Sequence, residues 1–113
     1  MKINEVEALV GISKKNIRFY EEEGLLCPQR NSENGYRDYS EEDVERLRKI
    51  IVFRKLGMSL PDIEDVLDGA KPLSQAVEEN IVNLEMQIEE LKGALFVCHK
   101  LQDEKEEMDT FEA

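Results

Sequence analysis

The chain of 113 residues is long enough for one small domain with a modest core and an appended segment, and its formal net charge is −11 at pH 7. No run of residues is apolar and long enough to span a membrane, and no signal peptide opens the chain. The two cysteines stand far apart without a metal-binding spacing, which argues against a disulfide scaffold and predicts a reducing, cytoplasmic setting.

The chain opens with a predicted helix over residues 3–10. Its apolar residues recur at helical spacing, namely Ile3, Val6, Leu9 and Val10. Asn4 and Glu7 resemble a capping box at its start, and Gly11 is expected to end the helix and make the following turn.

A second helix is predicted from Ser13 to Glu23. Ser13 is a good N-cap, because its hydroxyl can accept a hydrogen bond from a backbone amide of the first turn. Ile17 and Tyr20 point to a face that can dock on a core, and another face is basic, with Lys14, Lys15 and Arg18. Helix, glycine turn and helix over residues 4–24 form a helix-turn-helix pattern that suits the major groove of DNA. Taken alone, such a basic pattern is more often a solvated surface helix.

The two adjacent aromatic residues of this helix are expected to differ in exposure. Tyr20 is expected to face the core with its hydroxyl at the surface, whereas Phe19 is the exposed candidate for contact with a thymine methyl group or a sugar. Both are candidate DNA-binding residues.

A hairpin is predicted over residues 28–39, after Gly24 has ended the second helix and the next two leucines have folded into the core. Asn34-Gly35 is the preferred pair for a two-residue type I′ turn, in which both residues have positive φ. Arginine and tyrosine, which can bind phosphate, flank the turn at Arg30, Tyr36, Arg37 and Tyr39. A basic helix followed closely by a basic and aromatic hairpin indicates a winged helix-turn-helix.

Two more helices are predicted before a hinge at residues 69–72. Ser40, with Asp43 three residues later, caps the first, which has the apolar face Val44, Leu47, Ile50 and Ile51 and ends at Gly57. Four of its basic residues are interpreted as a solvated face, namely Arg46, Arg48, Lys49 and Lys55. Ser59 caps a short helix that runs to about Leu67.

The acidic clusters at 21–23 and 41–43 are also interpreted as solvated helix faces.

A heptad pattern then predicts a long helix from Pro72 to Met108. Its apolar residues, which we call the seam, are Val77, Ile81, Leu84, Ile88, Leu91, Leu95 and Cys98. A stripe this narrow has no partner left in so small a domain, so a second copy of the chain is the expected partner. The charged end after Lys100 has three readings, namely a frayed helix end, an acidic tail or the start of a missing effector region. Met108 and Phe111, two apolar residues in this charged end, favour the third.

The acidic net charge is the main argument against DNA binding. Residues 1–70 carry 11 Lys and Arg against 15 Asp and Glu, and residues 71–113 carry 4 against 11. Ten of the 11 basic residues in the first part lie between Lys14 and Lys55. The sequence therefore predicts that the acid is concentrated away from the basic surface, and that binding is weakened by salt.

Catalytic and metal sites find no support in the sequence, so no enzyme activity and no cofactor are expected. There is no G-x-S-x-G, H-E-x-x-H or phosphate-loop motif, and His99 is the only histidine. Cys98 occupies the seam and His99 turns away from it, so the two cannot both reach one ion. Cys27 is interpreted as a small apolar residue.

The sequence resembles the MerR family of bacterial transcription regulators. The resemblance is carried by I-R-F-Y-E-E-E-G-L-L at 17–26 and N-G-Y-R-D-Y at 34–39, continues through S-E-E-D-V-E-R-L at 40–47 and L-G-M-S-L at 56–60, and covers residues 2–68. It implies that Lys15 and Arg18 contact bases in the groove. It also implies phosphate contacts from Tyr36, Arg37, Tyr39 and Arg54, with Lys14 and Asn34 as additions. Where family members often carry arginine, this chain has Asn31, with Arg30 one position earlier.

The family resemblance also implies a mechanism. Two long helices pair antiparallel, and the homodimer binds a pseudo-palindromic promoter in double-stranded DNA, with RNA polymerase as a further partner. The protein distorts an over-long promoter spacer in response to an effector sensed outside this chain.

The expected architecture is mainly α, with a winged helix-turn-helix domain at 1–70 (the helix-turn-helix at 4–24 and the wing at 28–39). A dimerisation helix at 71–108 and a tail at 109–113 follow. The alternative is an acidic coiled-coil module that binds another protein and does not bind DNA.

Overall fold

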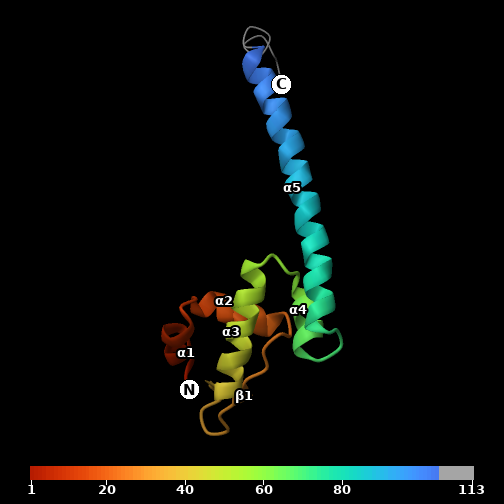
Figure 1. Cartoon of the computed structure of the whole chain (residues 1–113). Helices are drawn as coiled ribbons and strands as arrows, with labels where there is room; N and C mark the ends of the chain where they lie inside the picture. The colour runs from red at the N-terminus through yellow and green to blue at the C-terminus, as the bar shows by residue number, and fades with distance from the viewer. Residues whose placement is uncertain (105–113) are drawn as a thin grey trace. The chain divides into compact units, whose positions relative to one another are not determined.

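The computed structural model describes residues 1–104 and is mainly helical, as the sequence predicts (Figure 1). Its elements are α1 (Ile3–Val10), α2 (Lys14–Glu22), β1 (Gln29–Arg30), β2 (Arg37–Asp38), α3 (Glu41–Lys55), α4 (Leu60–Leu67) and α5 (Leu73–Asp103). One unit, which we call the head, comprises Met1–Ala76, and a second unit begins at Val77. Within residues 1–104, no helix combines the length and apolar composition that a membrane crossing requires.

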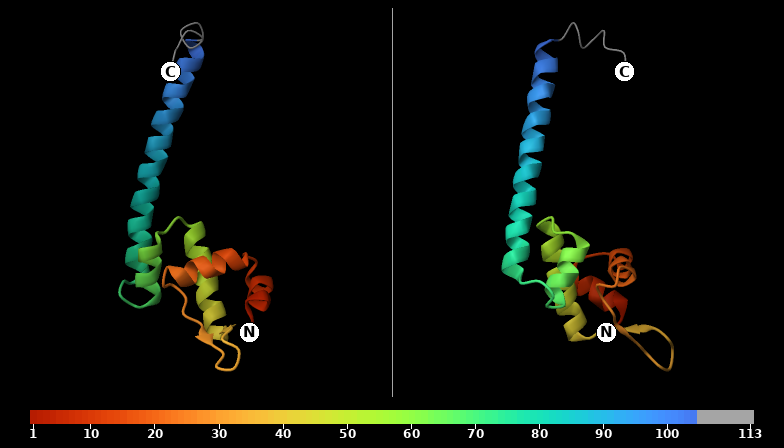
Figure 2. Two further views of the ribbon diagram at one scale, coloured as in Figure 1. Left: turned by 180° about the vertical axis from the view of Figure 1, so that it is seen from behind. Right: turned by 90° about the vertical axis from the view of Figure 1, so that its right-hand side faces the viewer.

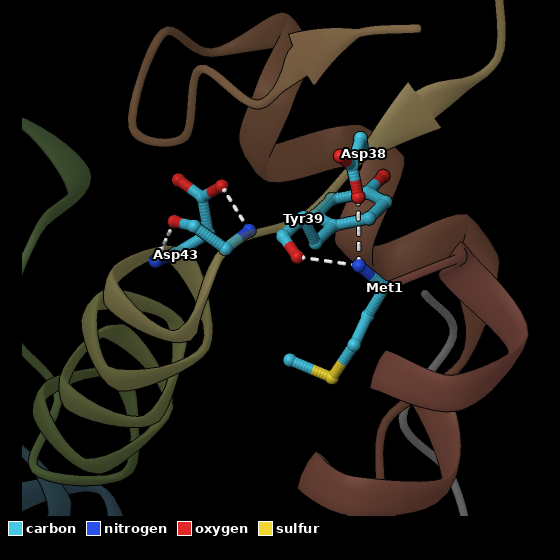
Figure 3. A network of polar contacts seen from close by, with 5 residues as sticks. Met1, Asp38, Tyr39 and Asp43 are labelled. Carbon is cyan, nitrogen blue, oxygen red and sulfur yellow. Dashed lines mark hydrogen bonds and ion pairs between the residues drawn. The ribbon is translucent and has the colours of Figure 1, made fainter.

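Three serine side chains cap helices where the sequence predicts them. Ser13 accepts a hydrogen bond from the backbone amide of Asn16 at 3.2 Å, and Ser59 accepts one from Asp62 at 3.2 Å. At α3 the cap is reciprocal (Figure 3). The Ser40 hydroxyl accepts a hydrogen bond from the Asp43 amide at 3.1 Å, and the Asp43 carboxylate accepts one from the Ser40 amide at 2.9 Å. These caps fix where α2, α3 and α4 begin.

The predicted capping box at the start of α1 is wrong. The N-cap of α1 is Lys2, which makes no side-chain cap hydrogen bond. Glu7 instead reaches the next helix, where its Oε2 accepts from the Lys14 backbone amide at 2.8 Å. Gly11, at φ +75°, makes the turn that brings the two helices together. A carboxylate at the N-terminus of a helix is favourable, and this contact ties α1 to α2.

Two apolar clusters form the core of the head. The first contains the buried residues Val6, Ile17, Leu26, Tyr39, Val44 and Leu47. The second contains Leu25, Ile50, Met58, Ile63 and Ala76. Tyr20 packs against both, so α2 is held where the clusters meet. The prediction that the two leucines after Gly24 enter the core is confirmed.

The wing is a two-stranded antiparallel hairpin with a longer loop than predicted. Gln29 pairs with Asp38 and Arg30 with Arg37, which leaves residues 31–36 as the loop. The predicted type I′ turn is wrong, because no non-glycine residue among those described has positive φ, and only Gly35 of the pair does, at +72°. Asn34 uses its side chain instead, accepting from the Tyr36 amide at 3.0 Å. Both views of Figure 2 show this loop extending away from the helices of the head.

The N-terminal amine holds the base of the wing. It donates to the Asp38 carboxylate at 2.8 Å and to the Tyr39 carbonyl at 2.7 Å (Figure 3). The Tyr39 amide in turn donates to the Met1 carbonyl at 2.8 Å. The first residue thus continues the pairing of the wing past β2.

The interpretation of Arg46 as a solvated residue is wrong. Its Nε donates to the Leu25 carbonyl at 2.6 Å, and an Nη donates to the Asp68 carboxylate at 2.9 Å. Arg46 therefore joins the end of the helix-turn-helix to the end of α4.

Helix α5 contains 31 residues, roughly 46 Å at 1.5 Å per residue. Its first turn, through Ala76, belongs to the head. In the single chain the seam residues from Val77 to Leu95 are between 37% and 69% exposed, and Cys98 is exposed too. The predicted continuation of the helix to Met108 and the tail with Phe111 lie outside the described residues.

Replacing Glu7 with alanine is expected to lower the free energy of unfolding by about 1–2 kcal/mol, because a first-turn amide of α2 loses a charged acceptor. Urea denaturation followed by circular dichroism measures this change. The control is Asn4→Ala, which should change stability by less than about 0.5 kcal/mol. A larger loss of unfolding free energy for Asn4→Ala than for Glu7→Ala would contradict this and support a capping box formed by Asn4 and Glu7.

Candidate nucleic-acid interface

Helix α2 has a buried face and an exposed basic face. Ile17 is fully buried and anchors the helix on the first cluster. Lys15 and Arg18 are exposed, whereas Lys14, the first helical residue, is half-buried. The basic face predicted for this helix therefore consists mainly of two side chains, which extend from a helix that the core holds in place.

The predicted division between the two aromatic residues is confirmed. Phe19 is 40% exposed, and Tyr20 is half-buried against both core clusters. The two rings touch, with centroids 5.6 Å apart and planes tilted by 58°. Tyr20 thus lies between Phe19 and the core, and Phe19 contributes a flat apolar ring to the exposed face of α2.

The wing carries exposed basic, polar and aromatic side chains. Tyr36 is 71% exposed, and Arg30 and Asn34 are exposed as well. The Arg30 guanidinium lies over its own loop and donates to the Gly35 carbonyl at 3.4 Å. The Asn34 side-chain oxygen is engaged by the loop amide, so its NH₂ group is the part that can donate outward.

Glu21 joins the wing to α2. Its Oε2 accepts a hydrogen bond from the Arg37 Nε, and its Oε1 accepts one from the Tyr39 hydroxyl. Glu21 and Arg37 also line one surface hollow together with Leu26, Pro28, Glu22 and Arg30. An acidic side chain therefore lies among the basic groups predicted to bind DNA.

The predicted contact of Tyr39 with phosphate does not fit its position. The ring is 1% exposed and belongs to the first core cluster. Burial, the hydrogen bond to Glu21 and the negative charge of Glu21 raise the pKa of the Tyr39 phenol above its ordinary value, and the charges of Arg37 and Arg18 lower it by less. Tyr39 is thus a neutral structural anchor of the wing.

Arg54 lies exposed at the C-terminal end of α3, apart from the wing in sequence. One Nη donates to the Met58 carbonyl at 3.1 Å, which satisfies the turn after the helix. The remaining guanidinium donors can serve a second acceptor. The placement is compatible with the backbone contact that was predicted for Arg54.

Sequence reasoning missed Glu21, which was interpreted as part of a solvated acidic triplet. The signal that could have found it is its spacing. Glu21 follows the core residue Ile17 by four positions, so both lie on the same face of α2. The prediction that acid is concentrated away from the basic surface therefore fails at this residue, whose side chain is only 9% exposed.

The exposed groups of the head suit binding of a polyanion. Arginine and lysine attract phosphate, and exposed rings can pack on sugars or bases. Among residues 1–104, no three histidine, cysteine, aspartate or glutamate side chains are placed to hold a metal ion together.

Residues 1–70 match the family model described as MerR HTH family regulatory protein. A probable heavy metal-dependent transcriptional regulator from Haemophilus influenzae is 41% identical over 99 residues, covering 81% of this chain and 77% of the relative.

Two solved structures share the fold. The transcription regulator PbrR691 from Ralstonia metallidurans, in complex with lead(II), has a TM-score of 0.79 at 27% identity, over 91% of this chain and 86% of that one. HiNmlR, a MerR family regulator lacking the sensor domain and bound to promoter DNA, has a TM-score of 0.57 at 27% identity, over 91% and 78%.

Tyr39→Phe is expected to lower the free energy of unfolding by about 1 kcal/mol near neutral pH, because the Glu21 hydrogen bond is lost. A raised folded-state pKa stabilises the neutral phenol below the unfolded value of about 10, and that contribution disappears as pH rises further. The stability difference between wild type and variant should therefore shrink above pH of about 10. Urea denaturation of both proteins between neutral and alkaline pH tests this, and a constant difference would contradict it.

Proposed function

The chain belongs to the MerR family of helix-turn-helix transcription regulators, which bind DNA and are not enzymes, and on that premise we propose that it binds promoter DNA as a homodimer. Each head would place α2 in a major groove and its wing on the neighbouring phosphate backbone. The observation that carries the proposal is the exposed set of Lys15, Arg18 and Phe19 on a helix that Ile17 and Tyr20 anchor in the core.

Within this interface, we assign groove contacts to Lys15, Arg18 and Phe19. Backbone contacts are assigned to an outer group on α3 and the wing, namely Arg30, Asn34, Tyr36, Arg37 and Arg54, with Lys14 at the edge of the surface. Tyr20 and Tyr39 become supporting residues, since the first is half-buried and the second is buried. This assignment removes two tyrosines from the predicted DNA contacts.

The seam of α5 supports the homodimer. Seven apolar or small residues at heptad spacing are exposed in one chain, and burying them against an identical helix removes apolar surface from water. A two-fold dimer presents two recognition helices and therefore suits a pseudo-palindromic target. We propose that residues 71–108 serve this pairing in antiparallel orientation and that residues 1–70 bind DNA.

We propose that the dimer regulates transcription by bending and untwisting an over-long promoter spacer, in contact with RNA polymerase in the cytoplasm. Such a mechanism uses DNA deformation energy as well as base contacts. HiNmlR, which lacks a sensor domain, was solved on promoter DNA. A family member that binds promoter DNA without a sensor domain supports DNA binding by this chain, with any effector recognised outside it.

The second candidate function is an acidic coiled-coil protein that binds another protein through its head. The net charge of −11 favours it, because it opposes approach to DNA. The exposed basic and aromatic face of α2 disfavours it.

Fluorescence-anisotropy titration onto the protein's own promoter and onto mixed genomic DNA tests the DNA-binding proposal. Wild type should bind the promoter more tightly than mixed DNA, and its affinity should fall as salt rises because counterions compete for the phosphates. Arg18→Ala should weaken promoter binding by about tenfold or more, because a groove contact is lost.

The control for Arg18→Ala is Lys92→Ala, which removes the same charge from the long helix, where Lys92 pairs with Glu89 at 3.3 Å. This variant should bind like wild type. Absence of binding at low salt by a dimeric wild type would contradict the proposal and favour the protein-interaction function.

The dimer is tested by light scattering of Leu84→Glu and Val82→Glu. Leu84 lies in the seam, and Val82 lies two residues away on another face of the same helix. The glutamate at position 84 should dissociate the dimer, because a buried interface would then contain unpaired charge. Val82→Glu should remain dimeric. A dimeric Leu84→Glu would show that the seam is not the interface.

A further inference from the structure

Glu21 connects the two parts of the proposed DNA-binding surface. We propose that Glu21 is a positioning residue for DNA binding, because its carboxylate holds the Arg37 guanidinium so that the outer edge of that group meets phosphate. The proposal rests on the DNA-binding function given above. It assigns a favourable role to a negative charge that lies beside a polyanion.

Both oxygens of the Glu21 carboxylate are engaged by the wing. Arg37 Nε and the Tyr39 hydroxyl each donate to a different oxygen, from 16 and 18 residues along the chain. The Glu21 side chain is 9% exposed, whereas that of Arg37 is 36% exposed. The carboxylate is thus enclosed by its donors while the guanidinium still reaches solvent.

The hydrogen bond from Nε leaves the outer edge of the Arg37 guanidinium for another acceptor. Guanidinium carries five N–H donors in a planar fork, and Nε contributes only one of them. Arginine binds phosphate most strongly through two parallel N–H donors. With Nε on Glu21, the two terminal nitrogens can address one phosphate together.

Holding Arg37 before DNA arrives reduces the cost of binding. A long side chain loses rotamer freedom when it contacts a phosphate, and in this protein part of that freedom is already lost in the folded state. The Tyr39 ring, buried in the core, fixes the carboxylate from its other oxygen. The position of Arg37 therefore depends on the core through Glu21.

The repulsion between Glu21 and phosphate opposes this benefit, but two features limit it. Both carboxylate oxygens accept hydrogen bonds, and Arg37 places a positive charge directly against them. Removing the carboxylate would instead leave the buried Tyr39 hydroxyl without its acceptor and Arg37 without its anchor. We expect the loss of positioning to outweigh the relief of repulsion.

The matched pair Glu21→Gln and Glu22→Gln separates the two effects. Each removes one negative charge from the same end of α2, and Glu22 is exposed. In anisotropy titrations on the protein's own promoter, Glu21→Gln should bind about five- to tenfold more weakly than wild type, since an amide cannot replace the charged hydrogen bond to Arg37. Glu22→Gln should bind as tightly as wild type or more tightly, because it only removes repulsion. Circular dichroism establishes that each variant is folded at the assay temperature.

An Arg37→Met background tests whether Glu21 acts through the arginine. In that background, Glu21→Gln should no longer weaken binding and should improve it slightly, because only the repulsion remains to be removed. The dependence of affinity on salt provides a second measure. In the Arg37→Met variant, the slope of log affinity against log salt should fall by about 0.9, the value for one lost phosphate contact on duplex DNA. Glu21→Gln alone should lower the slope by part of that amount.

The outcomes separate this inference from the proposed function. If wild type binds no DNA at low salt, the DNA-binding function itself is contradicted. If wild type binds and Glu21→Gln binds equally or better, the positioning role is overturned and the function stands. An equal weakening by Glu21→Gln with and without Arg37 would also overturn it, because Glu21 would then act only through the fold.

Discussion

The architecture of the head depends on the buried Tyr39 ring, whose hydroxyl donates to Glu21 of α2. Strands of two residues cannot hold a wing in place by backbone hydrogen bonds alone, because an isolated hairpin is marginal in water. Side chains, together with the N-terminal residue, therefore set the position of the wing. Tyr39 packs in the same cluster as Ile17, which anchors α2, so α2 and the wing are held by the same part of the core. Any shift of that cluster would move both parts of the proposed DNA-binding surface together.

Local sequence signals were enough to locate the helices. Three helices are capped by serines through contacts that span only three residues, at Ser13, Ser40 and Ser59. A serine before an apolar repeat predicts such a contact. Glycine at position 11 marks a helix end, since it can adopt the positive φ that ends a helix. The heptad spacing likewise predicts α5, because such a repeat depends only on residues close together in the sequence. The family resemblance added which of these elements are expected to contact DNA.

The contacts that the sequence could not reveal join residues distant along the chain or depend on local competition. Glu7 was expected to cap its own helix but reaches Lys14, and Arg46 was expected in solvent but bridges Leu25 and Asp68. Glu21 lies in a run of three acids whose members look alike, and only the three-dimensional position of the wing distinguishes it. At Asn34, the side chain satisfies a loop amide and the backbone avoids the strained conformation that a two-residue turn requires.

The exposed seam of α5 has a consequence for dosage. Two chains must associate before two recognition helices can bind one target. The apolar seam that is exposed in a single chain favours this association. At concentrations below the dissociation constant of the dimer, the amount of dimer rises with the square of the chain concentration. Promoter occupancy would then respond steeply to small changes in synthesis or degradation. Protein abundance would itself become an input to the promoter, in addition to any effector.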